Sequence, residues 1–538
     1  MLRLSKDGIK HKKAWQDAGI ELPEFDYDKM ISDTRENPTW VHFGAGNIFR
    51  GFIAMLQQQL LNLGKAQTGI VAVETFDFEI IDRIYAPYDN LSLLVILDSD
   101  GTMDKKIVAS VSEGLIGDVS REQDWNRLKE IFSKPSLQMA SFTITEKGYC
   151  LKDVSGEYFE DVIQDMQNGP GRPRHVISKV ASLAYTRYKN GELPIAFVSM
   201  DNCSHNGEKL HESLETVVKK WVDNGLVERG FLAYINDDSK VSFPWTMIDK
   251  ITPRPSELIN ALLHSIGFNS AEIICTNKNT YIAPFVNTER PQYLVVEDSF
   301  PNGRMPLELA GVLFTDRQTV DKVEKMKVCT CLNPLHTALA VFGCLLGYKL
   351  ISDEMNDNLL KKLVEKIGYE EGLPVVVNPG ILSPEDYIRE VIEQRLPNPY
   401  IPDTPQRIVT DTSQKLGVRF GETIKAYRDR EDLDPESLTY IPLVVAGWCR
   451  YLLGLDDWGA PMPLSPDPML SVLRSYLSGI RLGDADSVGD SLKPILSNES
   501  IFGLNLYDVG LGEKIEDYFK ELVSGTNAVR ATLKKYLG

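Results

Sequence analysis

The chain has 538 residues, enough for two or more domains, each with its own hydrophobic core. Hydrophobic residues make up 43% of it and charged residues 25%, which is typical of a globular protein and excludes a disordered or fibrous one. Its 76 acidic and 58 basic side chains give a formal charge of -18, which disfavours binding to nucleic acid or to an anionic membrane.

The sequence also indicates where the protein is located and whether its cysteines are reduced. The N-terminal segment carries charges throughout, and no unbroken apolar run reaches the length of a membrane span, so we expect a cytoplasmic protein. The seven cysteines are scattered and odd in number, which is typical of reduced thiols. Cys329 and Cys331 lack the second cysteine pair or the histidine cluster that a zinc site needs, so no metal is predicted.

The predicted elements define an α/β chain with two parts. The first 40 residues are polar and are expected to pack on the first domain as an extension. From Trp40 onward helical patterns alternate with the apolar segments WVHFG, GIVAVET, LSLLVIL, MASFTITEKGY, PIAFVSMDN and AEIICTN, which predicts a mostly parallel, Rossmann-like sheet with crossover helices. Beyond QYLVVEDSFPNGR the chain reads mainly as helices. We place the boundary near residue 295, giving domains at 1–295 and 296–538.

A glycine-rich turn follows the first predicted strand. Gly44 and Gly46 fit the first two positions of a dinucleotide-binding turn, but the third glycine would fall at Phe49, so spacing alone leaves cofactor binding and a simple tight turn equally open. Glu74 ends the second strand, where an acidic residue binds the ribose of NAD and repels the 2′-phosphate of NADP. The alternative is a solvated residue at the end of a strand.

A second group of polar residues occurs in VEKMKVCTCLNPLHTALAVFGCLLGY. One helix is expected to end soon after Lys327 and another to begin with Asn333 as its N-cap and Pro334 as its first residue, which places His336 at the same helix start. Glu324 and Lys327 are expected to share a face of the preceding helix. From spacing alone, a capping asparagine and a surface lysine remain the simpler interpretation.

These segments resemble the mannitol dehydrogenase family of long-chain polyol dehydrogenases and hexuronate reductases. The family has a lysine followed by an asparagine and, three residues further on, a histidine, which Lys327, Asn333 and His336 match. It also has a G-x-G-x-x-x-R turn, so the resemblance implies that Arg50 takes the place of a third glycine. It further implies that Asn47 and Arg50 join Gly44 and Gly46 in cofactor binding.

Similar matches extend from about Trp40 to Phe420. TITEKGY resembles the family's strand end near the nicotinamide and implies a cofactor contact for Glu146. SMDNCSHNG and FPWTMIDKITPRP resemble elements that imply roles for Asn202 and Asp249. RIVTDTSQK carries Arg407 and Lys415 at the spacing of the family's substrate-binding arginine and lysine.

The chain departs from the family pattern at one place. The family usually has one residue fewer between its lysine and asparagine, and usually a small residue where Pro334 stands. Because Glu324 and Met326 anchor Lys327 on the upstream side, we interpret the extra residue as a bulge within VCTCL.

The resemblance implies hydride transfer between NAD and a carbinol or keto carbon without a metal. Lys327 is the implied acid/base, a role that needs burial or cationic neighbours to make an amine a base near neutral pH. Asn202 and Asn333 would donate hydrogen bonds to the reacting oxygen, and His336 and Asp249 would hold neighbouring hydroxyls.

Arg407 and Lys415 bear on the substrate class, because two cations suit the carboxylate of a sugar acid and also serve the hydroxyls of a polyol. The turn FGAGNIFRGF looks closer to the hexuronate reductases, which implies reduction of D-fructuronate to D-mannonate. Tagaturonate reduction and mannitol–fructose interconversion are the next alternatives. An NADH-binding regulator and a zinc-dependent dehydrogenase are rival classes. The protein is expected to be a monomer or a homodimer.

Overall fold

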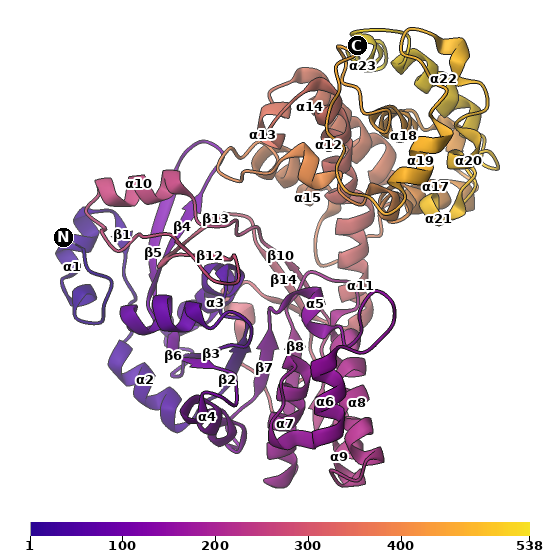
Figure 1. Cartoon of the computed structure of the whole chain (residues 1–538). Helices are drawn as coiled ribbons and strands as arrows, with labels where there is room; N and C mark the ends of the chain where they lie inside the picture. The colour runs from indigo at the N-terminus through magenta and orange to yellow at the C-terminus, as the bar shows by residue number, and fades with distance from the viewer. Residues whose placement is uncertain (1) are drawn as a thin grey trace. The chain divides into compact units, whose positions relative to one another are not determined.

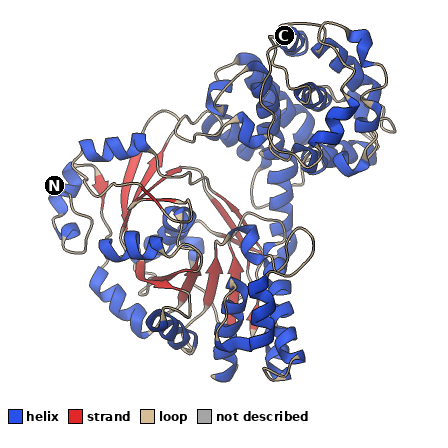
Figure 2. Cartoon of the chain, in the orientation of Figure 1, coloured by secondary structure: helices blue, strands red, loops and turns tan. Residues whose placement is uncertain are grey.

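A computed structural model describes residues 2–538 of the protein (Figures 1 and 2). The chain divides into two compact units, Met1–Leu97 with Gly101–Asp321, and Asp98–Asp100 with Lys322–Gly538. The first unit extends beyond the boundary predicted near residue 295. Two strands explain this, since β14 (Tyr293–Glu297) pairs with β15 (Leu313–Thr315), which holds the intervening segment in the first unit.

The first unit is built on a six-stranded parallel sheet with the order β6-β3-β2-β7-β8-β9. Along the chain these are the third, second, first, fourth, fifth and sixth strands of the sheet, which is the strand order of the Rossmann dinucleotide-binding fold. Their bounds are β2 Trp40–Phe43, β3 Ile70–Glu74, β6 Val111–Ile116, β7 Met139–Phe142, β8 Ile195–Ser199 and β9 Val241–Ser242. The order reverses between β2 and β7, and ligands of such sheets bind at the carboxyl ends of the strands at this point.

Both faces of this sheet are covered, which explains why its strands are nearly continuous apolar runs. Val41 and Phe43 of β2 pack with α4, α7 and α8, whereas Trp40 of the same strand packs with α3 on the opposite face. The helices of the unit are α1 Lys12–Asp17, α2 Tyr27–Glu36, α3 Ala54–Asn62, α4 Glu122–Phe132, α5 Thr145–Tyr149, α6 Glu160–Asn168, α7 Val176–Lys189, α8 Asn206–Asp223, α9 Arg229–Ile235 and α10 Glu257–Ser265.

Two predicted strands of the main sheet lie elsewhere. LSLLVIL forms β4 (Ser92–Leu97), which pairs antiparallel with β5 (Met103–Val108) in a separate sheet, β1-β5-β4-β13. AEIICTN contributes only β11 (Ile274–Cys275), half of a hairpin with β12 (Tyr281–Ile282). In that four-stranded sheet, β13 (Phe285–Glu289) pairs parallel with β4. Another sheet has the order β10-β14-β15, with β10 at Thr246–Asp249. The N-terminal extension packs on this unit as predicted, because β1 (Ile20–Glu21) pairs with β5.

The second unit is helical, as the sequence predicted. Its central helix α12 (Asn333–Leu346) is buried around nearly its whole circumference, the pattern of a core helix. The other helices are α13 Ile351–Glu354, α14 Asn358–Glu365, α15 Pro384–Glu390, α16 Pro405–Ile408, α17 Glu422–Asp429, α18 Tyr440–Tyr451, α19 Leu470–Tyr476, α20 Lys493–Leu496, α21 Glu499–Phe502, α22 Gly512–Leu522 and α23 Ala528–Leu537.

One helical run was not anticipated from the sequence. It spans Arg317–Leu346 and comprises α11 (Arg317–Lys325), a π-helical turn and α12. By length and composition alone, this run is long and apolar enough to cross a membrane. Its most apolar window is 78% buried inside the protein, as in the core helix of a globular domain.

Candidate active site

The glycine-rich turn after β2 lies at the point where the strand order of the main sheet reverses. Gly44 has a φ of 103°, and a Cβ at this position would lie 2.2 Å from the carbonyl oxygen of Thr143, so only glycine fits. A Cβ at Gly46 would meet no protein atom within 4 Å. The folded chain therefore does not itself require glycine at position 46. A helix begins directly after it, at Asn47.

Glu74 at the end of β3 holds this turn in place. Its Oε2 accepts a hydrogen bond from the N–H of Ala45 at 3.1 Å, and its Oε1 accepts from the N–H groups of Thr75, Phe76 and Asp77. Burial raises the pKa of this carboxyl group, and the four backbone donors oppose that rise. The predicted ribose-binding acid thus also has a structural role that the sequence did not reveal.

Arg50 is buried and contacts the protein through both terminal nitrogens. Its Nη1 donates to the carbonyl oxygen of Ala283 at 2.7 Å, and its Nη2 donates to Oδ1 of Asn47 at 3.0 Å. Asn47 in turn donates to the carbonyl oxygen of Pro253. Both residues were predicted to bind the cofactor, which stays a prediction. In the structure their side chains join the helix after the turn to the β10–β13 region.

Asp201 follows β8 and fixes the segment after the neighbouring strand β7. Its two carboxylate oxygens accept hydrogen bonds from the N–H groups of Ile144 and Thr145, each at 2.9 Å, and Thr145 has a φ of 63°. Tyr149 donates to the same carboxylate at 2.6 Å. Sequence reasoning did not predict this contact, because it joins residues more than 50 positions apart.

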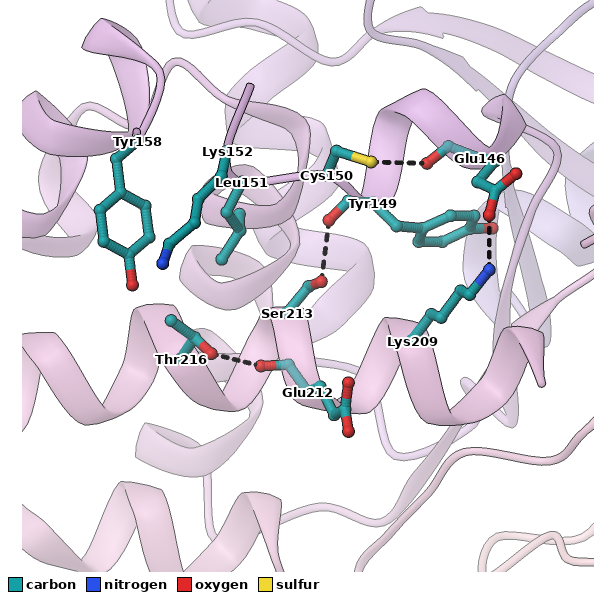
Figure 3. Close-up of a pocket in the computed structure, with 10 residues that line it drawn as sticks. All are labelled: Glu146, Tyr149, Cys150, Leu151, Lys152, Tyr158, Lys209, Glu212, Ser213 and Thr216. Atoms are coloured by element: carbon teal, nitrogen blue, oxygen red, sulfur yellow. Dashed lines mark hydrogen bonds and ion pairs between the residues drawn. The ribbon is translucent and has the colours of Figure 1, made fainter. Parts of the chain in front are cut away.

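Glu146 lies beside a pocket of about 410 Å³ between α5, the following segment and α8 (Figure 3). Its carboxylate pairs with Lys209, and both side chains are substantially exposed. Tyr149, Lys152, Tyr158 and Ser213 also line the pocket. Nothing in this arrangement distinguishes a cofactor contact for Glu146 from a surface ion pair, so its predicted role stays a prediction.

The other two candidates of the first unit lie at the carboxyl ends of strands. Asn202 is exposed and directly follows Asp201, beyond the end of β8. Asp249 is the last residue of β10 and is buried, with its backbone in register with Tyr293 of β14. Asn202 thus lies at the edge where parallel sheets of this type bind small molecules, whereas Asp249 ends a strand that pairs antiparallel with β14 in another sheet.

Lys327 of the second unit lies in a π-helical turn, Met326–Cys331, between α11 and α12. The N–H of Leu332 donates to the carbonyl oxygen of Lys327 at 3.1 Å, five residues back, as in a π-helix. A π-turn accommodates one extra residue within a continuous helix, and this turn overlaps the segment VCTCL in which the bulge was predicted. Lys327 itself is only 3% exposed.

The predicted N-cap at Asn333 is wrong. Asn333 is the first residue of α12, Leu332 holds the cap position, and no side chain caps this helix. The helical run continues through the π-turn, so α12 does not begin with a full set of free N–H groups that would need a cap. The amide side chain of Asn333 is therefore not used for capping.

His336, one turn into α12, faces Asp403. Its Nε2 lies 3.3 Å from the Oδ2 of Asp403, and the Nε of Arg407 donates to Oδ1 of the same carboxylate at 2.6 Å. Burial lowers the pKa of His336, although Asp403 opposes this shift. A neutral ring beside a carboxylate carries its proton on Nε2, so Nδ1 is left as a hydrogen-bond acceptor. Sequence reasoning missed Asp403, which lies far along the chain from His336.

Two more cations lie close to this group. Lys415 donates to the carbonyl oxygen of Thr410, and burial together with the nearby Arg419 lowers the pKa of its amine. Arg419, which sequence reasoning also missed, donates from Nη1 to Oγ1 of Thr337 at 2.6 Å. Thr337 directly follows His336, so α12 connects the predicted histidine with both missed residues.

Within residues 2–538 no group of three or more His, Cys, Asp or Glu side chains is arranged to hold a metal ion. No disulfide bond joins any of the cysteines in this part of the chain.

Comparison with known proteins agrees with this architecture. Residues 38–309 match the model of the mannitol dehydrogenase Rossmann domain, and residues 319–523 match that of the mannitol dehydrogenase C-terminal domain. A solved structure of Pseudomonas fluorescens mannitol 2-dehydrogenase, a ternary complex with NAD and D-mannitol, has a TM-score of 0.70 and 26% identity, and the match covers 99% of both chains.

Curated relatives extend the comparison. The D-mannonate oxidoreductase of Thermotoga maritima is 58% identical over 100% of this chain and 99% of its own length. The mannitol 2-dehydrogenase of Cereibacter sphaeroides is 29% identical over 78% of this chain and 82% of its own length. The Rossmann strand order, the helical second unit and these matches together show that the chain belongs to the mannitol dehydrogenase family.

Proposed function

We propose that this enzyme catalyses the reversible, NAD-dependent reduction of D-fructuronate to D-mannonate. The observation that carries the proposal is the 58% identity, over the full length, to a protein named D-mannonate oxidoreductase. The group of cations around His336 also supports a negatively charged sugar as the substrate.

The residues of the first unit fit a nicotinamide dinucleotide. Gly46 leaves open space where a Cβ would project, and the helix that begins at Asn47 presents its first N–H groups at the carboxyl end of β2. These groups would hold a pyrophosphate. Glu74, at the end of β3, is an acidic residue at the position that disfavours a 2′-phosphate, so we expect NAD in preference to NADP. NADH, when bound, supplies the hydride for the keto carbon.

The side chains of this chain would then manage the substrate oxygen. During reduction Lys327 gives a proton to the oxygen of the keto group, and during oxidation it takes that proton back. Asn202 and Asn333 donate hydrogen bonds to the same oxygen and so stabilise the negative charge that develops on it. Because the side chain of Asn333 does not cap α12, its amide N–H is not committed to the helix.

His336 and Asp249 would orient the remaining hydroxyl groups. With its proton on Nε2 toward Asp403, His336 offers Nδ1 as an acceptor for a substrate hydroxyl. Asp249 would accept from another hydroxyl. This pairing of acceptors with hydroxyls fixes the sugar so that its keto carbon is presented for hydride transfer.

The test is a panel of D-fructuronate, D-tagaturonate and D-fructose, each assayed with NADH and with NADPH before and after dialysis against a chelator. We expect the highest kcat/KM with D-fructuronate and NADH, unchanged by the chelator. Preference for tagaturonate or fructose would favour the corresponding family activity. No turnover combined with tight NADH binding would favour a regulator, and loss of activity after dialysis would indicate a metal-dependent enzyme.

A further inference from the structure

Three cationic side chains of the second unit surround the start of α12, but only one of them has an anionic partner. Arg407 is paired with Asp403, which also faces His336. Lys415 and Arg419 form no ion pair with any carboxylate in the part of the chain that the structure describes. The charge of Arg407 is therefore offset by an ion pair. Asp411 and Asp467 attract the Lys415 amine without forming an ion pair with it, and Arg419 has no ion pair with a described carboxylate.

Arg419 is hydrogen-bonded to α12. Its Nη1 donates to Oγ1 of Thr337, and the same hydroxyl donates to the carbonyl oxygen of Asn333 at 2.8 Å. This chain of hydrogen bonds connects the guanidinium to the first turn of α12, which carries Asn333 and His336. Burial lowers the pKa of Arg419 to about 10. A guanidinium that is only partly exposed and has no ion-pair partner is costly, because part of its hydration is lost without a compensating anion.

A carboxylate supplied by a ligand would offset this cost. A guanidinium presents two parallel N–H donors to a carboxylate, and a neighbouring ammonium adds a further charge-assisted hydrogen bond. Lys415 is four residues before Arg419 in the chain, and the positive charge of each disfavours that of the other. An anion between them would relieve this repulsion.

We propose that Arg419, together with Lys415, forms the subsite that binds the carboxylate of a sugar-acid substrate, and that Arg419 is the residue that selects sugar acids over neutral keto sugars. This proposal rests on the proposed function and specifies how the carboxylate is recognised. It adds Arg419 to the pair Arg407 and Lys415, whose predicted substrate binding stays a prediction, and Arg407 also pairs with Asp403, which faces His336.

The test compares D-fructuronate with D-fructose in variants of these residues. Arg419→Gln should raise KM for D-fructuronate by about 10- to 100-fold, the value of one charge-assisted hydrogen bond, and should leave KM for D-fructose within about threefold. Guanidinium ion added to an Arg419→Ala variant should restore part of the rate with the acid only. Arg419→Lys should retain part of the preference. The exposed Arg428→Gln is the matched control and should leave both substrates unchanged.

The outcomes separate this proposal from the proposed function. Turnover of fructuronate by the unmodified enzyme decides the proposed function. If another sugar acid is the preferred substrate, the same comparison is made with that acid. Equal losses with acid and neutral substrates, together with a lowered melting temperature, would show that Arg419 acts only through Thr337 as a structural residue. An unchanged KM for the acid, or an unmodified enzyme that reduces only neutral sugars, would overturn the proposal.

Discussion

The carboxylate of Glu74 accepts a hydrogen bond from the backbone N–H of Ala45 at 3.1 Å, so the end of β3 braces the turn between Gly44 and Gly46. Glu74→Ser should therefore act in two ways. It should narrow the preference for NADH over NADPH, because the acidic group is lost. It should also weaken the binding of both cofactors by about 1–3 kcal/mol, because several backbone donors lose their acceptor.

Titration calorimetry with both cofactors measures these effects. Tyr85 also contacts the turn, since its hydroxyl donates to the carbonyl oxygen of Ala45 at 2.9 Å. Tyr85→Phe is the matched control, because it removes one bond to the turn and keeps the acid, so it should weaken both cofactors equally. A Glu74→Ser variant that binds NADH as tightly as the unmodified enzyme would contradict the bracing role.

The sequence predicted those parts of the molecule that local patterns determine. Gly44, the strand ending at Phe43 and the acid at Glu74 could be located because a tight turn and a buried strand have clear local patterns. The apolar run at Ser92–Leu97 was assigned to the wrong sheet, since a buried strand looks the same whether its partner is parallel or antiparallel. The contacts of Asp403 and Arg419 with α12 depend on packing between distant segments, so no local pattern could predict them.

Glu354 supports a prediction about stability and pH. It is fully buried against Gly343 of α12, and neither of its carboxylate oxygens has a hydrogen-bond partner among the described residues. Burial raises its pKa well above the usual value. Above the pKa of the unfolded chain, the folded state keeps a proton that the unfolded state has lost, so the free energy of unfolding falls as pH rises toward the folded pKa.

Glu354→Gln should remove this dependence. Between the unfolded and the folded pKa of Glu354, the free energy of unfolding of the variant should exceed that of the unmodified protein by about 1.4 kcal/mol more for each pH unit. Melting temperatures of both proteins over a pH series measure this difference. Glu371→Gln is the matched control. Glu371 is buried too, but its carboxylate accepts from the N–H groups of Tyr440 and Ile441 at the start of α18, so its substitution should destabilise. A Glu354→Gln variant that melts lower at pH 8 would show that the carboxylate has a partner.

Asn333 supports a prediction that separates catalysis from helix capping. Because Asn333 is the first helical residue and not the N-cap, Asn333→Ala should lower kcat without the loss of about 1 kcal/mol expected for a lost cap. Calorimetry and turnover measured on the same preparation check this. Asn498 is a true N-cap in this unit, since its side chain accepts from the N–H of Ser500. Asn498→Ala should show the opposite pattern, with a lower melting temperature and an unchanged kcat.

The π-helical turn leads to the last prediction, which concerns the identity of the acid/base. Lys325 and Lys327 are two residues apart, so either could be matched to the catalytic lysine of the family. Which of them is the acid/base depends on where the chain accommodates the extra residue between the lysine and the asparagine. The structure places the π-turn at Met326–Cys331, so Lys327 keeps its place relative to α11 while the extra residue is absorbed beyond it.

Lys327→Ala should therefore abolish most of kcat and leave NADH binding nearly intact, because the dinucleotide-binding turn belongs to the first unit. Small primary amines should restore part of the rate in this variant by supplying the missing proton donor. If Lys327→Ala turns over normally and Lys325→Ala is inactive, the acid/base is two positions upstream and the π-turn does not have the role assigned to it.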